Sequence, residues 1–146
     1  MSDALNLRRL NAGDYGALVE LWTAAGLPYK PHGRDSRSAF EHQLTLPQIA
    51  FFGLFDHDRI IGTSLVTHDG RKGWINRVAV HPDYRRRGLA IRLIRESEQW
   101  LVSCGIGIFA CLIEGYNDTS RATFKAAGYE LFEGVTYFTR RVDPDV

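Results

Sequence analysis

Three arginines and a glycine, Arg85 to Gly88, lie between a β-branched run that ends at Pro82 and a helical apolar stripe that begins at Leu89. The first turn of a helix leaves backbone N–H groups without partners and carries partial positive charge. A strand that leads directly into a helix therefore offers an anion such as phosphate several donors, and glycine lets the anion approach the backbone. The sequence predicts a junction that can hold a phosphate where this basic, glycine-containing loop meets the helix.

Hydrophobic periodicity predicts the elements that must hold this junction. Helices are expected from Asn11 or Asp14 to Gly26 and over residues 36–44, 88–103 and 119–127. β-rich runs predict strands at 4–10, 49–55, 59–67, 74–80, 106–113, 129–133 and 135–141. The passage from 74 to 113 reads as strand, helix, strand, so its two strands should lie parallel in an otherwise antiparallel sheet. We expect 106–113 to be a buried central strand and the last two runs to form a hairpin around Gly134.

Length and charge narrow the class of protein. The 146 residues suit a single domain spanning 1–146. The 18 Lys and Arg nearly cancel the 17 Asp and Glu, for a net charge of +1, which disfavours a nucleic-acid-binding protein. No apolar run is long enough to span a bilayer, so we expect no membrane association and a cytoplasmic location.

Metal and redox chemistry find little support in the sequence. Cys104 and Cys111 have neither metal-ligand nor redox-motif spacing, and both are expected to be core residues. The five histidines lie in different segments without ligand spacing. We therefore expect no metal site.

Three ordered features carry a resemblance to a known family. They are the strand end Val78-Ala79-Val80-His81-Pro82, the signature Arg85-x-x-Gly88-x-Ala90, and Asn117 placed eleven residues before Gly128-Tyr129. With these features the chain resembles the GNAT superfamily of N-acetyltransferases. The resemblance implies the acyl-CoA N-acyltransferase fold, an α/β mixed and mostly antiparallel sheet of about six or seven strands with a parallel central pair and about four flanking helices.

The resemblance also implies a cosubstrate, acetyl-CoA, bound between the two parallel strands. Its diphosphate would bind the N–H groups of residues 86–91, its pantetheine arm would pair with the strand end at residues 78–80, and an N–H there can face the thioester oxygen. Asn117 is either a further cofactor contact or a helix cap. The cofactor-binding residues implied are Val78, Ala79, Val80, Arg85, Arg86, Arg87, Gly88, Leu89, Ala90, Ile91, Asn117 and Phe124.

Two positions depart from the family pattern. Asn76 stands where members often carry a general-base glutamate, and Phe124 stands where many carry a tyrosine acid. Glu114 could be the base or only a solvated carboxylate, Tyr116 or Tyr84 could be a phenolic donor, and a bound water could relay the proton. Candidate catalytic residues are therefore Glu114, Tyr116 and Asn76.

The function implied is acetyl transfer from acetyl-CoA to a primary amine by direct attack in a ternary complex. The alternative is an acyl-CoA-binding sensor or degenerate transferase without efficient catalysis. The acceptor, a small molecule or a protein amino group, is left open, and family members often form homodimers. A basic loop with Lys30, His32, Arg34 and Arg37 either favours an acidic acceptor or is merely a solvated surface.

Overall fold

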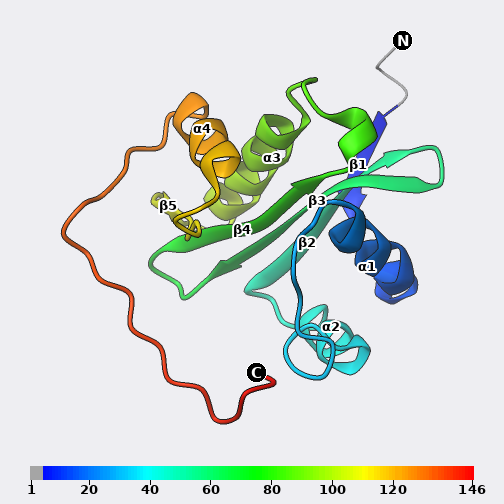
Figure 1. Cartoon of the computed structure of the whole chain (residues 1–146), viewed down its shortest axis with the longest axis horizontal. Coiled ribbons are helices and arrows are strands. Elements are labelled where there is room, and N and C mark those ends of the chain that lie inside the picture. Colours follow the sequence, from blue (N-terminus) through cyan, green and yellow to red (C-terminus); the bar gives the residue numbers. More distant parts are fainter. Residues whose placement is uncertain (1–4) are drawn as a thin grey trace.

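A computed structural model of the chain, described for residues 5–146, arranges five strands into one sheet in the order β1-β2-β3-β4-β5 (Figure 1). Neighbours from β1 to β4 are antiparallel, whereas β4 and β5 are parallel, as the strand–helix–strand pattern predicted. The strands are β1 (Leu5–Arg9), β2 (Ile49–Asp56), β3 (Arg59–His68), β4 (Gly73–Val80) and β5 (Phe109–Ala110).

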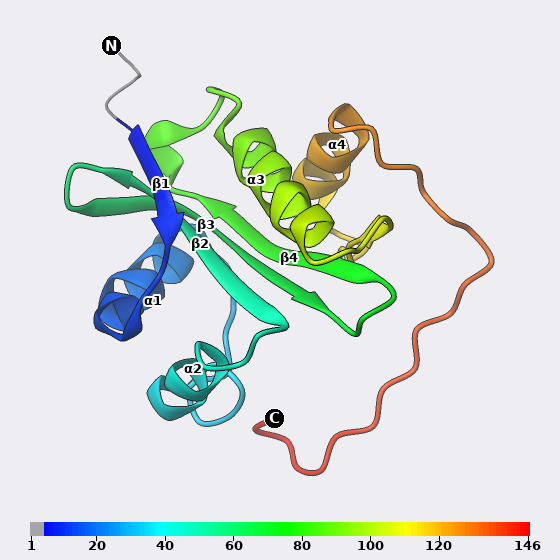
Figure 2. The ribbon, with the colours of Figure 1, turned by 180° about the vertical axis from the view of Figure 1, so that it is seen from behind.

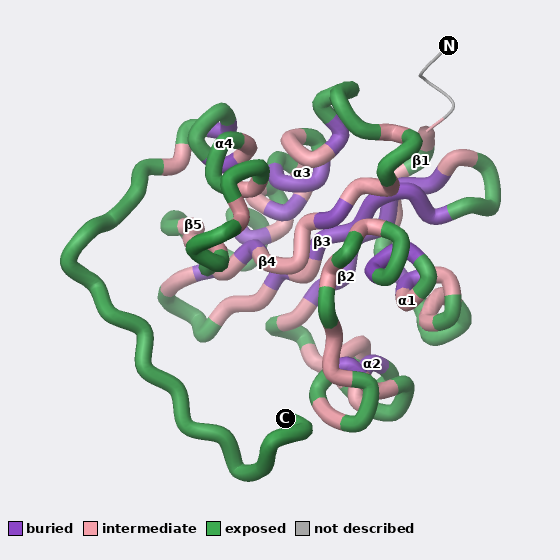
Figure 3. Tube along the Cα trace, viewed as in Figure 1, coloured by how far each residue is buried: buried purple, intermediate pink, exposed green. Residues whose placement is uncertain are grey.

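Helices cover both faces of this sheet (Figures 1 and 2). The helices are α1 (Tyr15–Ala24), α2 (Arg37–Gln43), α3 (Leu89–Ser103) and α4 (Asp118–Ala126), with 3-10 turns η2 (Ala12–Asp14) and η3 (Pro82–Tyr84). Trp22 of α1 and Phe40 of α2 pack on one face, and Leu93 of α3 and Phe124 of α4 pack on the other. The buried residues therefore form two clusters separated by the sheet (Figure 3).

Local side-chain caps explain where several helices begin. Asn11 and Asp14 form a reciprocal capping box at η2, and Ser36 accepts a hydrogen bond from the backbone of Ala39 at the start of α2. The Arg8 guanidinium donates to both carboxylate oxygens of Asp14 and holds the pKa of that carboxyl below its usual value. α3 begins at a glycine, Gly88, with no side-chain cap, which leaves its first-turn donors available.

The C-terminal part differs from the sequence predictions. β5 comprises two residues at the edge of the sheet, so the prediction of a long, buried central strand over 106–113 was wrong. The predicted hairpin at 129–141 was also wrong: these residues contain no strand, and the sheet has five strands rather than six or seven. The physical reason is that a strand needs a hydrogen-bonded partner, and this segment runs away from the sheet (Figures 1 and 2).

Two further features concern the surface. Cys104, expected in the core, is exposed because it lies at the end of α3, and Cys111 is half-buried. Among residues 5–146, no helix is long and apolar enough to cross a membrane.

The close packing of α3 against β4 gives a stability prediction. A Cβ added at Gly73 would lie 2.5 Å from Cδ1 of Leu101, so Gly73→Ala should lower the free energy of unfolding by about 1–3 kcal/mol through overpacking. A Cβ added at Gly107 would have no atom within 4 Å, so Gly107→Ala should change the free energy of unfolding by less than about 0.5 kcal/mol. Urea denaturation of the two variants checks this; equal stabilities would contradict it.

Candidate functional site

β4 and β5 separate soon after they begin to pair. Their register contains only Gly73 with Phe109 and Trp74 with Ala110. Beyond these pairs the Asn76 side chain replaces the backbone ladder, because its Oδ1 accepts a hydrogen bond from the Leu112 N–H at 3.1 Å. The β5-facing edge of β4 therefore has no strand partner over its second half, within the part of the chain that the structure describes.

A β-bulge occurs at the same place on the opposite edge of β4. Thr63 pairs with Ala79 and Leu65 pairs with Asn76, so two β4 residues lie opposite one β3 residue. Arg77, one of the two, has a φ of +52°, which is unusual for a residue with a side chain. Such a bulge bends the strand and leaves one residue out of the ladder. β4 therefore bends just before the predicted cofactor-binding residues 78–80.

The side chain of Arg77 packs toward α1. Its guanidinium lies 4.3 Å from the ring centroid of Trp22 and donates to the carbonyl oxygen of Pro28 at 2.9 Å. Burial lowers the pKa of this guanidinium. No motif in the sequence pointed to this residue, because neither its backbone conformation nor its stacking partner leaves a local pattern.

The loop from residue 85 to residue 88 brings the chain from η3 into α3. Arg86 has a φ of +65° and Gly88 a φ of +70°, so the loop turns twice through the left-handed region. Successive turns of this kind direct backbone N–H groups toward one concavity, which suits an anion. No protein atom lies within 4 Å of a Cβ built at Gly88, so space is open beside it. Arg85, Arg86 and Arg87 are all exposed.

Close contacts with the sheet fix the position of α3. A Cβ at Gly62 of β3 would lie 3.0 Å from Cδ1 of Leu93, so the helix lies directly on the backbone. The buried hydroxyls of Ser64 and Ser97 also meet at 2.9 Å between β3 and α3. At the start of the helix Leu89 is buried, while Ala90 and Ile91 are half-buried. The helix start is therefore held rigidly beside the separated end of β4.

Tyr84 has a structural partner. Its hydroxyl donates to the Asp56 carboxylate at the end of β2, and this bond raises the pKa of Tyr84 and lowers that of Asp56. The Arg87 guanidinium lies 5.1 Å from the Tyr84 ring centroid. Tyr84 thus anchors η3 and the arginine loop to the β2–β3 hairpin, which makes it a poor candidate for a proton donor.

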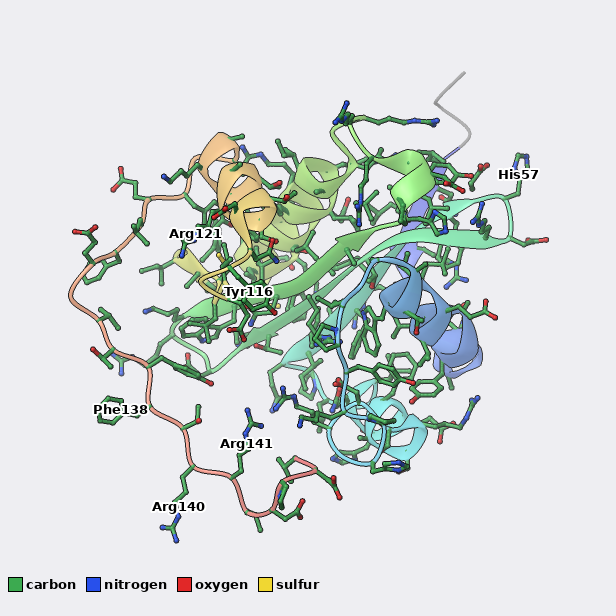
Figure 4. The ribbon with its side chains drawn as sticks, viewed as in Figure 1. His57, Tyr116, Arg121, Phe138, Arg140 and Arg141 are labelled. Atoms are coloured by element: carbon green, nitrogen blue, oxygen red, sulfur yellow. The ribbon has the colours of Figure 1, made fainter. Side chains whose placement is uncertain are left out.

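The loop between β5 and α4 carries the other predicted catalytic residues. Glu114 is exposed, and Tyr116 is 76% exposed. Figure 4 places Tyr116 on the loop that leads into α4 and Arg121 on α4 itself. Asn117 caps α4, since its side-chain oxygen accepts from the Ser120 N–H at 3.1 Å. The cap occupies that oxygen, so the Nδ2 group is the Asn117 donor that remains for a ligand.

Phe124 lies in the core. It is 6% exposed and meets the Tyr129 ring edge-on, with centroids 5.0 Å apart. The Tyr129 hydroxyl donates to Glu98 of α3 at 2.6 Å, and burial together with this bond raises the pKa of Tyr129. Phe124 therefore packs α4 against α3, and a contact between Phe124 and the cofactor stays a prediction.

Metal coordination has no candidate among residues 5–146, where no group of three or more His, Cys, Asp or Glu side chains could hold an ion.

Comparisons with known proteins agree with this arrangement. Residues 15–129 match the Acetyltransferase (GNAT) family. Among curated relatives, Acetyltransferase SG1711 of Sodalis glossinidius is 25% identical over 143 residues, covering 97% of this chain and 98% of the relative. Acetyltransferase ECA0875 of Pectobacterium atrosepticum is 25% identical over 141 residues, covering 95% and 97%.

Solved structures share the fold. The aminoglycoside acetyltransferase AAC(6')-Iy in complex with a bisubstrate analogue has a TM-score of 0.78 at 22% identity, covering 94% of this chain and 98% of its own. The PaiA N-acetyltransferase from Thermoplasma acidophilum in complex with coenzyme A has a TM-score of 0.75 at 19% identity, covering 88% and 91%. The chain belongs to the GNAT family of acetyltransferases, as its ordered motifs predicted. It is accordingly an acetyl-CoA-dependent N-acetyltransferase.

The hydrogen bond from Leu112 to Asn76 provides a test of how the two strands are held apart. Asn76→Ala should abolish protection of the Leu112 amide in hydrogen exchange, because no acceptor remains. Asn76→Asp keeps an oxygen in place and should retain the protection. If the amide exchanges at the same rate in the native protein and in Asn76→Ala, the side chain does not bridge these strands in solution.

Proposed function

We propose that this chain acetylates a primary amine by direct attack of the amine on the thioester of bound acetyl-CoA, in a ternary complex. The observation that carries the proposal is the open edge of β4 beside the uncapped start of α3. The β4 edge offers strand-like hydrogen bonds to an extended amide chain, and the start of α3 offers a cluster of N–H donors to a diphosphate. The pantetheine arm and the diphosphate of acetyl-CoA would therefore each find suitable hydrogen-bonding groups.

The diphosphate would bind the N–H groups of residues 86–91. Gly88 leaves room for the phosphate oxygens, and the exposed arginines of the loop supply positive charge to the diphosphate or to a further phosphate. The pantetheine amides would pair with residues 78–80 of β4. The residues present fit acetyl-CoA, because the N–H donors, the open space at Gly88 and the positive charge of the arginines all lie where β4 leads into α3.

The reaction would proceed without a covalent enzyme intermediate. The amine nitrogen forms a bond to the acetyl carbon, the carbon–sulfur bond breaks, and the nitrogen loses a proton. A β4 backbone N–H directed at the thioester oxygen would stabilise the negative charge that develops there. Holding amine and thioester in contact would supply much of the acceleration.

Proton transfer is assigned to the exposed loop and to solvent. Asn76 cannot accept a proton and is bound to Leu112, and Phe124 carries no hydroxyl. A thiol with a pKa near 8.5 leaves as a thiolate without help from an acid. Glu114 is then the general base, either directly or through water, with Tyr116 as a neighbouring donor.

A binding module without efficient turnover is the second candidate. It is favoured by the residues at the family's base and acid positions. Asn76 cannot act as a base, and Phe124 cannot act as an acid. The measurement that separates the two is release of free thiol from acetyl-CoA with a panel of primary amines. Thiol release that depends on the amine supports the transferase, and tight binding without release supports the sensor.

The acceptor is proposed to be a small molecule with a primary amine. Support comes from similar folds described as aminoglycoside acetyltransferases, including one in complex with sisomicin. The basic loop is partly occupied within the protein: the Lys30 ammonium donates to the Pro144 carbonyl at 3.4 Å, and the Arg37 guanidinium lies 4.8 Å from the ring centroid of Tyr15. The amine panel should therefore include both polycationic and carboxylate-bearing acceptors.

Gly88 offers a direct test of cosubstrate binding. Gly88→Glu places a carboxylate beside the diphosphate and should weaken acetyl-CoA binding at least about tenfold in calorimetry. Gly70→Glu is the matched control, because Gly70 also has positive φ, +88°, and also has no atom within 4 Å, but lies in the β3–β4 connection. Both variants carry the same kind of backbone strain. Equal affinities in the two folded variants would refute the assignment.

Glu114 offers a test of proton transfer. Glu114→Gln should lower kcat by about 10²-fold while leaving the dissociation constant of acetyl-CoA unchanged, because a glutamine cannot accept the proton. Glu130→Gln, also an exposed carboxylate, is the control and should leave kcat unchanged. An unchanged kcat in Glu114→Gln would assign the base role to solvent.

A further inference from the structure

Arg77 carries a positive charge that the described part of the chain does not neutralise. Its side chain is half-buried, and no ion pair joins its guanidinium to a carboxylate among residues 5–146. Asp35 attracts it only from beyond ion-pair distance, and the Asp35 Oδ2 instead accepts from the Lys30 N–H at 2.8 Å. The acceptor that Arg77 does have is the neutral carbonyl of Pro28. A partly buried charge without a counter-ion lowers stability, so its presence here indicates a role in binding an anion.

Two buried donors without an acceptor occur together at this place. Among the side chains of residues 5–146, the buried nitrogens that lack a hydrogen-bond partner are Trp22 Nε1 and Arg77 Nε. The two side chains are stacked, since the Arg77 guanidinium lies 4.3 Å from the Trp22 ring centroid. Buried polar groups in folded proteins nearly always have a partner, so such exceptions call for an explanation. A bound molecule that supplies an acceptor is one.

The surrounding structure fixes the orientation of the guanidinium. Arg77 lies in the β-bulge with a φ of +52°, a strained conformation that is most common at functional sites. Its stacking partner Trp22 is 2% exposed and packs against Tyr29, with ring centroids 5.8 Å apart. The bulge and the buried indole therefore hold the planar guanidinium in one position. A fork of N–H donors that is oriented in advance suits a carboxylate, which can accept two parallel hydrogen bonds from it.

Arg77 lies at the end of the cleft where the thioester is expected. In the proposed binding mode the diphosphate binds residues 86–91, and the pantetheine arm runs along β4 from Val80 toward Val78. The arm starts at Val80 because that end of β4 leads into the arginine loop. The thioester, at the far end of the arm, would then reach the bulge. Beyond Trp74 the edge of β4 that faces β5 has no strand partner in the described chain, so substrate groups at this point would border the α1 face, where the guanidinium stacks.

We propose that Arg77 is a specificity-determining residue that binds a carboxylate carried by a substrate next to the thioester. This inference rests on the proposed function, which places the thioester there. A carboxylate fits because it is planar and its single charge neutralises one guanidinium, and Arg34 adds positive potential nearby. Two substrates can present such a group: an amine acceptor that is an amino acid, or an acyl group with a terminal carboxylate, such as the succinyl group of succinyl-CoA.

The acceptor is tested by calorimetry on the protein saturated with coenzyme A. Glycine, β-alanine and γ-aminobutyrate are each compared with the corresponding carboxamide, which keeps the amine and removes the charge. If the acceptor carries the carboxylate, at least one acid should bind about tenfold or more tightly than its amide. Arg77→Gln should abolish this preference and leave the affinity of the amide unchanged, a result that loss of packing alone would not produce.

The acyl donor is tested in the same way with two thioesters. If the acyl group carries the carboxylate, succinyl-CoA should bind about tenfold or more tightly than acetyl-CoA. Arg77→Gln should remove the difference by weakening succinyl-CoA alone. An unchanged dissociation constant for acetyl-CoA shows that the variant is folded with an intact cleft. Arg77→Lys keeps the charge without the fork and should retain the preference only in part, and it replaces Arg77→Gln if that variant does not fold.

Arg9 provides the matched control, because its guanidinium also stacks on a tryptophan and also donates to a backbone carbonyl. It lies 5.6 Å from the ring centroid of Trp100 and 3.5 Å from the oxygen of Ile49, but on β1 at the opposite edge of the sheet. Arg9→Gln should keep every preference of the native protein.

The outcomes separate this inference from the proposed function. A carboxylate preference in neither series, or one that survives Arg77→Gln, overturns the role of Arg77 even where amines release thiol from acetyl-CoA. Binding of carboxylates that depends on Arg77 supports the role even where no thiol is released, and in that case only the proposed transfer reaction fails. The series that shows the preference identifies which substrate carries the carboxylate.

Discussion

The separation of β4 from β5 is the constraint on which the rest of the site depends. Two parallel strands that stayed paired would satisfy each other's backbone and leave no edge for a ligand. Here pairing stops after Trp74, and the Asn76 side chain takes the next hydrogen bond from Leu112. Together with the two backbone pairs, this contact keeps the strands attached at one end while they diverge at the other. The bulge at Arg77 bends β4 in the same region.

The start of α3 is useful only because it is fixed next to this divergence. A helix terminus by itself is a general anion site with little specificity. Close approach at Gly62 and Gly73 and the buried pair Ser64–Ser97 hold α3 on the sheet, so its terminus keeps a set position relative to the β4 edge. A ligand that has both a diphosphate and an extended amide chain can then contact both at once. In the proposed binding mode, the glycines of β3 and β4 would contribute to recognition without touching the ligand.

Much of the fold could be predicted from the sequence, because the relevant signals are local. Apolar spacing and caps such as Asn11 and Ser36 determine where helices begin. The length of β5 and the state of residues 129–141 could not be predicted, because an apolar run such as 106–113 reads as a strand whether or not a partner is present. Strand pairing depends on two segments, and in this chain residues 129–141 do not lie along the edge of the sheet at β5.

The candidate site was predictable to a similar degree and for a similar reason. The glycine–arginine loop is contiguous, so an anion site could be predicted there from spacing alone. The partners of Tyr84 and Phe124 are not contiguous: Asp56 lies 28 residues from Tyr84, and Phe124 is buried by packing between α3 and α4. Tyr84, considered as a proton donor, and Phe124, considered as a cofactor contact, thus both anchor the scaffold.

A site built largely from backbone groups tolerates this loss of acid–base side chains. The N–H groups at residues 86–91 and at the end of β4 are present whatever the side chains. In the proposed mechanism, substrate binding and stabilisation of the thioester oxygen would therefore not require a particular residue at position 76 or 124. A thiol with a pKa near 8.5 gives a good leaving group, and in the proposed mechanism Glu114 would take the proton of the amine, directly or through water. The family's usual glutamate and tyrosine would then accelerate the reaction in chains that carry them, whereas here the same positions are occupied by a strand bridge and a packing residue.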